Sequence, residues 1–254
     1  MGRRPPMLAL DVSAGYRGRT VVEVSASVPP GVTALVGPNG SGKTTLLRAI
    51  AGAIPARRRV EVDGRPLGPR DVAYLPHGGL DPNAKVGDEL EFYWEVLGAE
   101  RRDYAVDLLG LKELMGRKVG ELSRGQARRA ELAVVLALRR RVYLLDEPLE
   151  GLDVQYRGAV LGELRRLGEY VIFTTHDPSA VEAAAGWLLA LRGGRLAYSG
   201  PPSGLKGRVA IRARRGGEVV TVETDRPEEK VEELRSLGYS VEEVRSTAVE
   251  ELMR

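Results

Sequence analysis

The most constraining feature of this 254-residue chain is the segment GPNGSGKTT at Gly37–Thr45. The short apolar run VTALV precedes it and is typical of a buried parallel strand, while TTLLRAIAG after it predicts a helix that ends at Gly52. Glycines here let successive backbone N–H groups converge on one anion at the start of a helix. The pattern G-x-x-x-x-G-K-[ST] in this setting predicts a phosphate-binding loop, which we call the P-loop, rather than an ordinary glycine-rich turn.

The P-loop supplies predicted ligands for a nucleotide. Lys43 is expected to reach the β- and γ-phosphates, and the Thr44 hydroxyl is expected to hold Mg²⁺. The predicted phosphate-binding residues are Gly37, Pro38, Asn39, Gly40, Ser41, Gly42, Lys43, Thr44 and Thr45.

Acidic and basic side chains end two further apolar runs. In VYLLDEP, Asp146 is expected at the tip of a buried strand beside the strand of the P-loop, where its carboxylate could hold the metal through water. Glu147 follows it and is placed to orient or deprotonate an attacking water. In FTTHD, His176 ends the next strand and is expected to contact the γ-phosphate. An acidic pair that caps a helix and a polar surface histidine are the alternatives, and the P-loop favours the catalytic interpretation.

A second segment also points to phosphate. In GELSRGQARRAELA, Ser123 stands immediately before a long run of helix formers, as an N-cap does. Gly125 and Gln126 then leave the backbone bare at the first turn of this helix, whose positive dipole end suits an anion. The chain therefore carries two phosphate-directed segments.

The alternation of elements predicts an α/β fold with a mixed sheet. MLALDVS and TVVEVSASV indicate an N-terminal antiparallel β subdomain, the region of about residues 85–140 reads as a helical insert, and WLLALRGGRLAYSG reads as a hairpin. We expect a P-loop NTPase core in a domain over residues 1–204, followed by a small α+β extension over residues 205–254.

Taken together, these motifs resemble the ordered set of an ABC-type ATPase, over about residues 6–204. The resemblance is carried by Gly37–Thr45, LSRGQ at Leu122–Gln126, LLDEP at Leu144–Pro148, GLD at Gly151–Asp153 and His176. It implies that ATP and Mg²⁺ are bound, the metal by Thr44 and Asp146. It also implies that the signature loop, Leu122–Gln126, closes over ATP held by the P-loop of another subunit. The residues that it places in catalysis are Glu147, His176, Lys43 and His77, and those that it places on the partner's nucleotide are Ser123, Gly125 and Gln126.

Other positions are interpreted through the same resemblance. Tyr16 lies about where the family has an aromatic residue that stacks on adenine, although a plain loop tyrosine is an equal alternative. Arg124 replaces the usual second glycine of the signature, and Leu149-Glu150 replaces the usual Thr-Ser before GLD. His77, in YLPH, stands where the family usually has a glutamine that faces Mg²⁺ or the attacking water. A His77 that points away from the site is the alternative.

The resemblance further implies the ATP-hydrolysing subunit of a membrane transporter, acting as a homodimer or as a heterodimer with another ABC ATPase subunit. The longest mostly apolar stretches are too short to cross a bilayer, so a separate permease is expected to hold this cytoplasmic chain at the inner face of the cell membrane. The 38 basic and 35 acidic residues nearly balance, and no nucleic-acid partner is expected.

The direction of transport is predicted from the C-terminal residues. Their strand–helix–strand–helix order is similar to the short extension of ABC-2-type exporter ATPases, which favours an exporter over an importer. Two further interpretations compete with a transporter subunit, namely a soluble non-transport ABC ATPase and a weakly hydrolysing regulatory subunit. The presence of Glu147 and His176 counts against the regulatory subunit.

Overall fold

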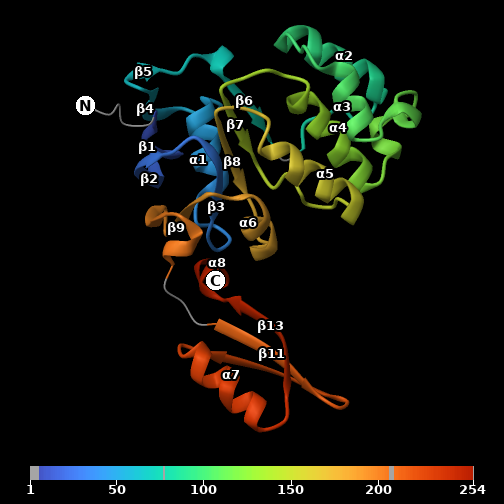
Figure 1. Cartoon of the computed structure of the whole chain (residues 1–254). Coiled ribbons are helices and arrows are strands. Elements are labelled where there is room, and N and C mark those ends of the chain that lie inside the picture. Colours follow the sequence, from blue (N-terminus) through green and yellow to red (C-terminus); the bar gives the residue numbers. More distant parts are fainter. Residues whose placement is uncertain (1–5, 77, 206–208, 254) are drawn as a thin grey trace.

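The computed structural model describes residues 6–76, 78–205 and 209–253, which form two β-sheets, one of ten strands and one of three (Figure 1). The strands of the large sheet, in spatial order, are β5 (Arg65–Pro66), β4 (Ala56–Val62), β1 (Leu8–Tyr16), β2 (Arg19–Val28), β10 (Arg195–Gly200), β9 (Trp187–Arg192), β3 (Gly31–Val36), β8 (Tyr170–Thr174), β7 (Val142–Leu145) and β6 (Val72–Leu75). The helices are α1 (Lys43–Ala51), α2 (Val86–Leu97), α3 (Arg102–Leu108), α4 (Arg124–Leu136), α5 (Val154–Leu164), α6 (Pro178–Ala184), α7 (Pro227–Ser236) and α8 (Ala248–Met253).

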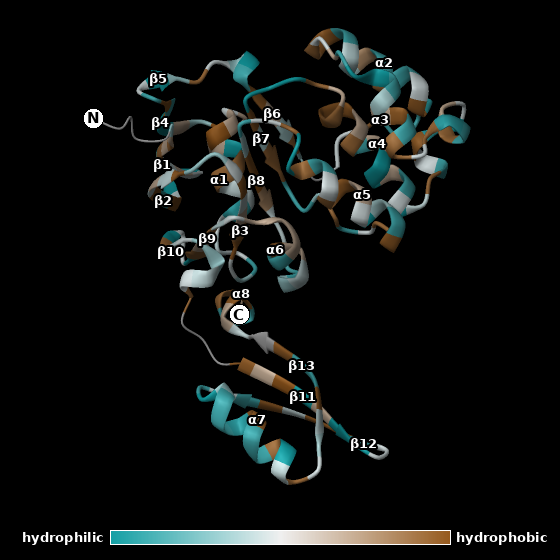
Figure 2. Cartoon of the chain, viewed as in Figure 1, coloured by the Kyte–Doolittle hydropathy of each residue, from teal (hydrophilic) through white to brown (hydrophobic). Residues whose placement is uncertain are grey.

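The parallel half of the large sheet brings the predicted site residues to one edge. Strands β9, β3, β8, β7 and β6 run parallel, and β7 and β8 are buried throughout, which explains their continuous apolar sequences (Figure 2). The P-loop follows β3, Asp146 follows β7, and His176 comes two residues after β8. The expectation that the strand of Asp146 lies beside that of the P-loop is wrong, because β8 lies between β3 and β7. Adjacency in a sheet depends on long-range pairing, which the local sequence does not encode.

The antiparallel half is the predicted N-terminal β subdomain. Strands β1 and β2 pair along their length, and β1 pairs with β4 on its other side. Buried and exposed side chains alternate along β1, as expected for a strand with one covered face. The buried residues of this half pack against α1 through Leu46, Leu47 and Ile50, so the helix that follows the P-loop is fixed to both halves of the sheet.

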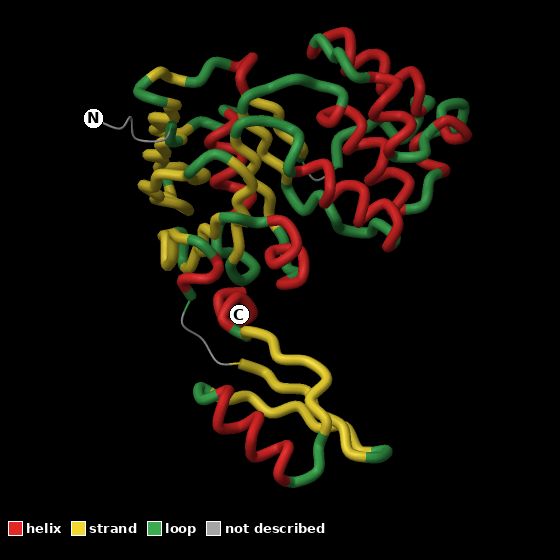
Figure 3. The backbone as a smooth tube through the Cα atoms, viewed as in Figure 1, coloured by secondary structure: helices red, strands yellow, loops and turns green. Residues whose placement is uncertain are grey.

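The helical insert lies to one side of the sheet (Figure 3). Trp94 of α2 is only 1% exposed and its indole N–H donates to the carbonyl oxygen of Ala133 in α4 at 3.1 Å. Phe92 is 60% exposed, so the two rings of this aromatic segment face opposite ways, as helical spacing predicts. Among the described residues, no helix has both the length and the apolar character that crossing a bilayer requires.

The C-terminal residues form the second sheet. Its order is β12 (Glu218–Thr224), β11 (Val209–Arg215) and β13 (Ser240–Ser246), with the largely hydrophilic α7 packed on one face (Figure 2). A small core of Ile211, Ala213 and Leu234 holds sheet and helix together. The last helix, α8, returns to the main body and contacts α6, and Val249 is buried there within the main core.

Candidate functional site

The P-loop is built so that its backbone folds tightly around an anion position. Gly37 and Gly42 have φ angles of 144° and 102°, in the region that favours glycine. A Cβ atom on Gly37 would lie 2.2 Å from the carbonyl oxygen of Leu191, and one on Gly42 would lie 2.3 Å from Val22 Cγ1. Within the described part of the chain, no side chain caps the N-terminus of α1, so its first N–H groups are available to an anion.

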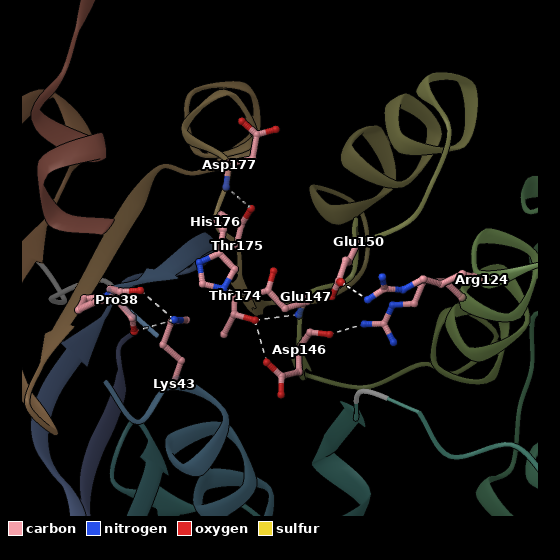
Figure 4. A network of polar contacts seen from close by, with 12 residues as sticks. Pro38, Lys43, Arg124, Asp146, Glu147, Glu150, Thr174, Thr175, His176 and Asp177 are labelled. Carbon is pink, nitrogen blue, oxygen red and sulfur yellow. Dashed lines mark hydrogen bonds and ion pairs between the residues drawn. The ribbon is translucent and has the colours of Figure 1, made fainter. Parts of the chain in front are cut away.

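Lys43 is held inside this loop. Its side chain is 8% exposed, and Nζ donates hydrogen bonds to the carbonyl oxygens of Gly37 at 2.8 Å and Pro38 at 3.2 Å (Figure 4). Burial lowers the pKa of Lys43, and the carboxylates of Glu147 and Asp146 oppose that shift. The ammonium group therefore lies in the loop that it is predicted to serve, close to two carboxylates.

Asp146 is fixed by Thr174, which the sequence analysis did not single out. The Thr174 hydroxyl donates to Asp146 Oδ1 at 2.8 Å and accepts the backbone N–H of Glu147 at 2.7 Å (Figure 4). Asp146 is 2% exposed, and its Oδ2 atom is buried without a hydrogen-bond partner among the residues described. One carboxylate oxygen is thus held in place and the other is left for a ligand.

Glu147 and His176 face each other in the cleft. Glu147 Oε1 lies 2.8 Å from His176 Nε2, a distance at which an imidazole N–H can donate a hydrogen bond to the carboxylate. The backbone of Glu147 has a φ of 49°, which a residue with a Cβ rarely adopts and which aims its side chain at the P-loop side (Figure 4). Burial raises the pKa of Glu147 to about 7, with Lys43 opposing the shift. Burial and the charge of Lys43 lower the pKa of His176.

These groups share a cleft of about 570 Å³. It is lined by Tyr16, Val21, Asn39, Gly40, Gly42, Lys43, Thr44, Thr45, Asp146, Glu147, Glu150 and His176. The structure therefore brings the predicted P-loop, strand-end and Tyr16 side chains together. Among the described residues that line the cleft, none comes from the signature loop. The predicted His77 lies outside the described residues.

The sequence pattern of the family described as ABC transporter matches residues 21–150, which is more than half of the chain. The chain belongs to the ABC transporter family. The match includes the P-loop, the signature loop and the Asp146–Glu147 pair, whereas His176 and the C-terminal sheet lie beyond it. The predicted resemblance to the ABC family is therefore confirmed.

Named relatives agree with this membership. The chain is 37% identical over 220 residues to the Fe(3+) ions import ATP-binding protein FbpC of Pseudomonas fluorescens, covering 77% of this chain and 62% of that protein. It is 32% identical over 231 residues to the molybdenum import ATP-binding protein ModC of Paramagnetospirillum magneticum, covering 83% and 63%. The chain thus spans about three fifths of the length of these relatives.

Solved structures support the fold. The ATP binding subunit of an ABC transporter matches with a TM-score of 0.68 at 22% identity, over 79% of this chain and 91% of that chain. A putative cobalt transport ATP-binding protein matches with a TM-score of 0.67 at 24% identity, over 86% and 92%. The predicted α/β fold with a P-loop NTPase core is therefore confirmed.

The signature loop of this ABC chain has a local structural role. The Ser123 hydroxyl accepts the backbone N–H of Gln126 at 3.3 Å, and Gln126 Oε1 accepts the backbone N–H of Ser123 at 3.0 Å. Ser123 is thus the N-cap of α4, as predicted. The expectation that Gln126 leaves the backbone of the first turn bare is wrong, because the two residues form a reciprocal capping box. Ser123 is exposed, so the face of the loop remains accessible to a second molecule.

Sequence reasoning missed a second group that supports the site. Arg128 of α4 is 4% exposed and donates to the carbonyl oxygens of Asp146 and, at 3.1 Å, of Pro76, while it pairs with Glu131 at 2.6 Å. The helix of the signature loop is thereby tied to the residues that directly follow β6 and β7. No local signal marks Arg128, because an arginine in a helix is normally expected at the surface. The position of Thr174 near His176, at the end of the same apolar run, was only a weak indication that it belongs to the site.

Proposed function

We propose that this chain binds ATP in the cleft between the P-loop and the ends of β7 and β8, and hydrolyses it to drive a separate permease. The observation that carries the proposal is the convergence of a buried ammonium group, Lys43, with Asp146, Glu147 and His176 on one cleft. A glycine loop at a helix N-terminus suits the phosphates, and a carboxylate paired with an imidazole suits activation of water.

The residues present fit Mg²⁺ at this cleft. Thr44 and Asp146 both line it, and Asp146 Oδ2 is a buried oxygen that lacks a hydrogen-bond partner within the described chain. Mg²⁺ usually takes only one or two protein ligands besides water and phosphate oxygens, so two residues suffice. A cation bound here would offset negative charge on the phosphates.

Each side chain of the cleft has its own proposed role in binding or hydrolysis. Lys43 contacts the phosphates, for which it would exchange its bonds to the P-loop carbonyl groups. Glu147 accepts a proton from the attacking water, and His176 holds the carboxylate in place through their 2.8 Å contact. Tyr16, at the rim of the cleft and 44% exposed, offers a ring face to adenine.

Two copies are proposed to close around two ATP molecules. Ser123, Gly125 and Gln126 are not among the described residues that line the cleft of their own chain, which favours a role at a nucleotide held elsewhere. The positive dipole end of α4 suits the phosphates of ATP in a partner chain, whether an identical copy or another ABC ATPase subunit. ATP that touches both subunits would stabilise the closed pair.

The names of the relatives support a proposal for the partner and for the direction of transport. FbpC and ModC are named import ATP-binding proteins, and we propose that this chain likewise drives a permease from the cytoplasmic face of the membrane. The names favour import, whereas the predicted export rested on the order of elements in the C-terminal sheet. Reconstitution of this chain with its permease in vesicles, with ATP supplied on one side of the bilayer, would measure the direction of transport directly.

Thr174→Val is expected to lower kcat by about 10- to 100-fold while the Kd for ATP changes little, because small displacements of catalytic groups cost rate. The change keeps the shape of the side chain but removes the hydroxyl that fixes Asp146 and the N–H of Glu147. Thr174→Ser, which retains the hydroxyl, is the matched control and should keep most of the activity. A Thr174→Val protein with the wild-type kcat would show that this link is not needed for hydrolysis.

The domain boundary predicts the effect of a truncation. Removing residues 205–254 should leave the affinity for ATP within about twofold, since none of the described residues that line the cleft comes from that region. The melting temperature should fall by about 2–4 °C for each kcal/mol lost, because the truncation uncovers the surface of α6 that Val249 covers. The point variant Val249→Asp should also lower the melting temperature without weakening ATP binding. A large loss of affinity in a folded truncated protein would place the boundary elsewhere.

A further inference from the structure

The structure joins the signature loop to a second segment at which the sequence departs from the usual ABC pattern. Arg124 replaces a glycine of the signature loop, and Glu150 replaces a serine before GLD. These residues are 26 positions apart, yet the Arg124 guanidinium and the Glu150 carboxylate form an ion pair (Figure 4). The positive charge that Arg124 introduces is therefore paired with the negative charge that Glu150 introduces.

The backbones of the two segments are also in close contact. A Cβ atom on Gly125 would lie 2.5 Å from the carbonyl oxygen of Gly151, which is why only glycine fits at Gly125. A Cβ atom on Gly151 would in turn lie 3.6 Å from Cγ of Arg124. The two segments that carry the ion pair are therefore packed against each other.

The position of Glu150 makes its charge relevant to nucleotide binding. Glu150 lines the same cleft as Lys43, Asp146 and Glu147, so three carboxylates surround the place proposed for the phosphates of ATP. Each additional carboxylate repels an anion at short range, and the repulsion is stronger where protein excludes water. Arg124 supplies a positive charge directly against the Glu150 carboxylate.

We propose that Arg124 and Glu150 are a matched charge pair that keeps the cleft attractive to the phosphates of ATP, so that each departure is tolerated because of the other. This inference rests on the proposed binding of ATP in the cleft. It assigns Arg124 a role within its own chain, in place of a direct contact with a partner's nucleotide.

We expect loss of the ion pair to change the affinity for ATP rather than the stability of the fold. The side chains of Arg124 and Glu150 are 73% and 40% exposed, and ion pairs at such positions add little to stability. Variants at both positions should therefore fold and melt like the wild type, which makes their affinities comparable.

A double-mutant cycle tests the pair. The four proteins are the wild type, Arg124→Gly, Glu150→Ser and the double variant, which carries the residues usual in the family. ATP binding is measured by calorimetry on the isolated chain in EDTA, at about 50 mM and about 500 mM salt. Adenosine, which lacks phosphates, is the matched control ligand.

Arg124→Gly alone is expected to weaken ATP binding about fivefold at low salt, and high salt should reduce the difference. The double variant should bind ATP like the Glu150→Ser protein, and adenosine should bind all four proteins alike. If the Arg124→Gly protein binds ATP with the wild-type affinity, the proposed role of the ion pair is wrong. The proposal is also wrong if Arg124→Gly weakens binding equally in the wild-type and Glu150→Ser backgrounds, since that result would indicate a direct contact between Arg124 and phosphate. A wild type that binds no ATP would instead overturn the proposed function, and the role of the pair with it.

Discussion

Glu147→Gln is expected to lower the rate of ATP hydrolysis by about 10²- to 10⁴-fold, the usual contribution of a general base. The amide keeps the size of the side chain but cannot take a proton from water. The backbone N–H at this position still donates to Thr174, so the fold of the segment should survive the change. ATP should therefore still bind, and two copies closed around it should accumulate because nothing releases them.

The two consequences are measured separately. Steady-state phosphate release gives the rate, and size exclusion with light scattering in ATP and Mg²⁺ gives the population of dimers. Glu182→Gln, at an exposed position of α6, is the matched control and should behave like the wild type. If the Glu147→Gln protein hydrolyses ATP at the wild-type rate, another group activates the water and the assignment is wrong.

Sequence patterns were sufficient to predict the parts of the site whose residues are contiguous along the chain. The P-loop could be predicted because its glycines, its lysine and its flanking elements are contiguous, from the start of β3 at Gly31 to the end of α1 at Ala51, and its geometry follows from that local order. Ser123 predicted the N-cap of α4 for the same reason, whereas its reciprocal bond with Gln126 was not predicted. Buried strands such as β7 and β8 were visible as apolar runs.

Contacts between distant segments could not be predicted in this way. The position of β8 between β3 and β7 is a property of the whole sheet. Thr174 meets Asp146 across 28 residues, and Arg124 meets Glu150 across 26, so neither partner carries a local sign of the other. The return of α8 to α6 was likewise not visible, because the six residues of α8 have no distinctive pattern. These contacts depend on tertiary packing, which single-sequence patterns do not report.

Ser123→Arg and Lys43→Ala are each expected to abolish most hydrolysis when present alone, for different reasons. Lys43→Ala removes the buried ammonium group of the P-loop, which costs affinity and rate in the chain that carries it. Ser123→Arg places a long side chain at the exposed start of α4, where it would block the approach of a partner's ATP. Each homodimer then has two defective sites.

The central claim is that one active site combines the P-loop of one chain with the signature loop of another, and mixing these two variants tests it most directly. A mixed dimer has one site with intact Lys43 and intact Ser123, and one site with neither. An equal mixture of independent sites should therefore recover up to about a quarter of the wild-type ATPase activity. A mixture of Ser123→Arg with the double variant Lys43→Ala/Ser123→Arg is the control and should recover none, because every signature loop in it is blocked. Recovery in the first mixture alone is the predicted result; no recovery, when both variants are folded and mixed dimers are detected, would contradict the composite site.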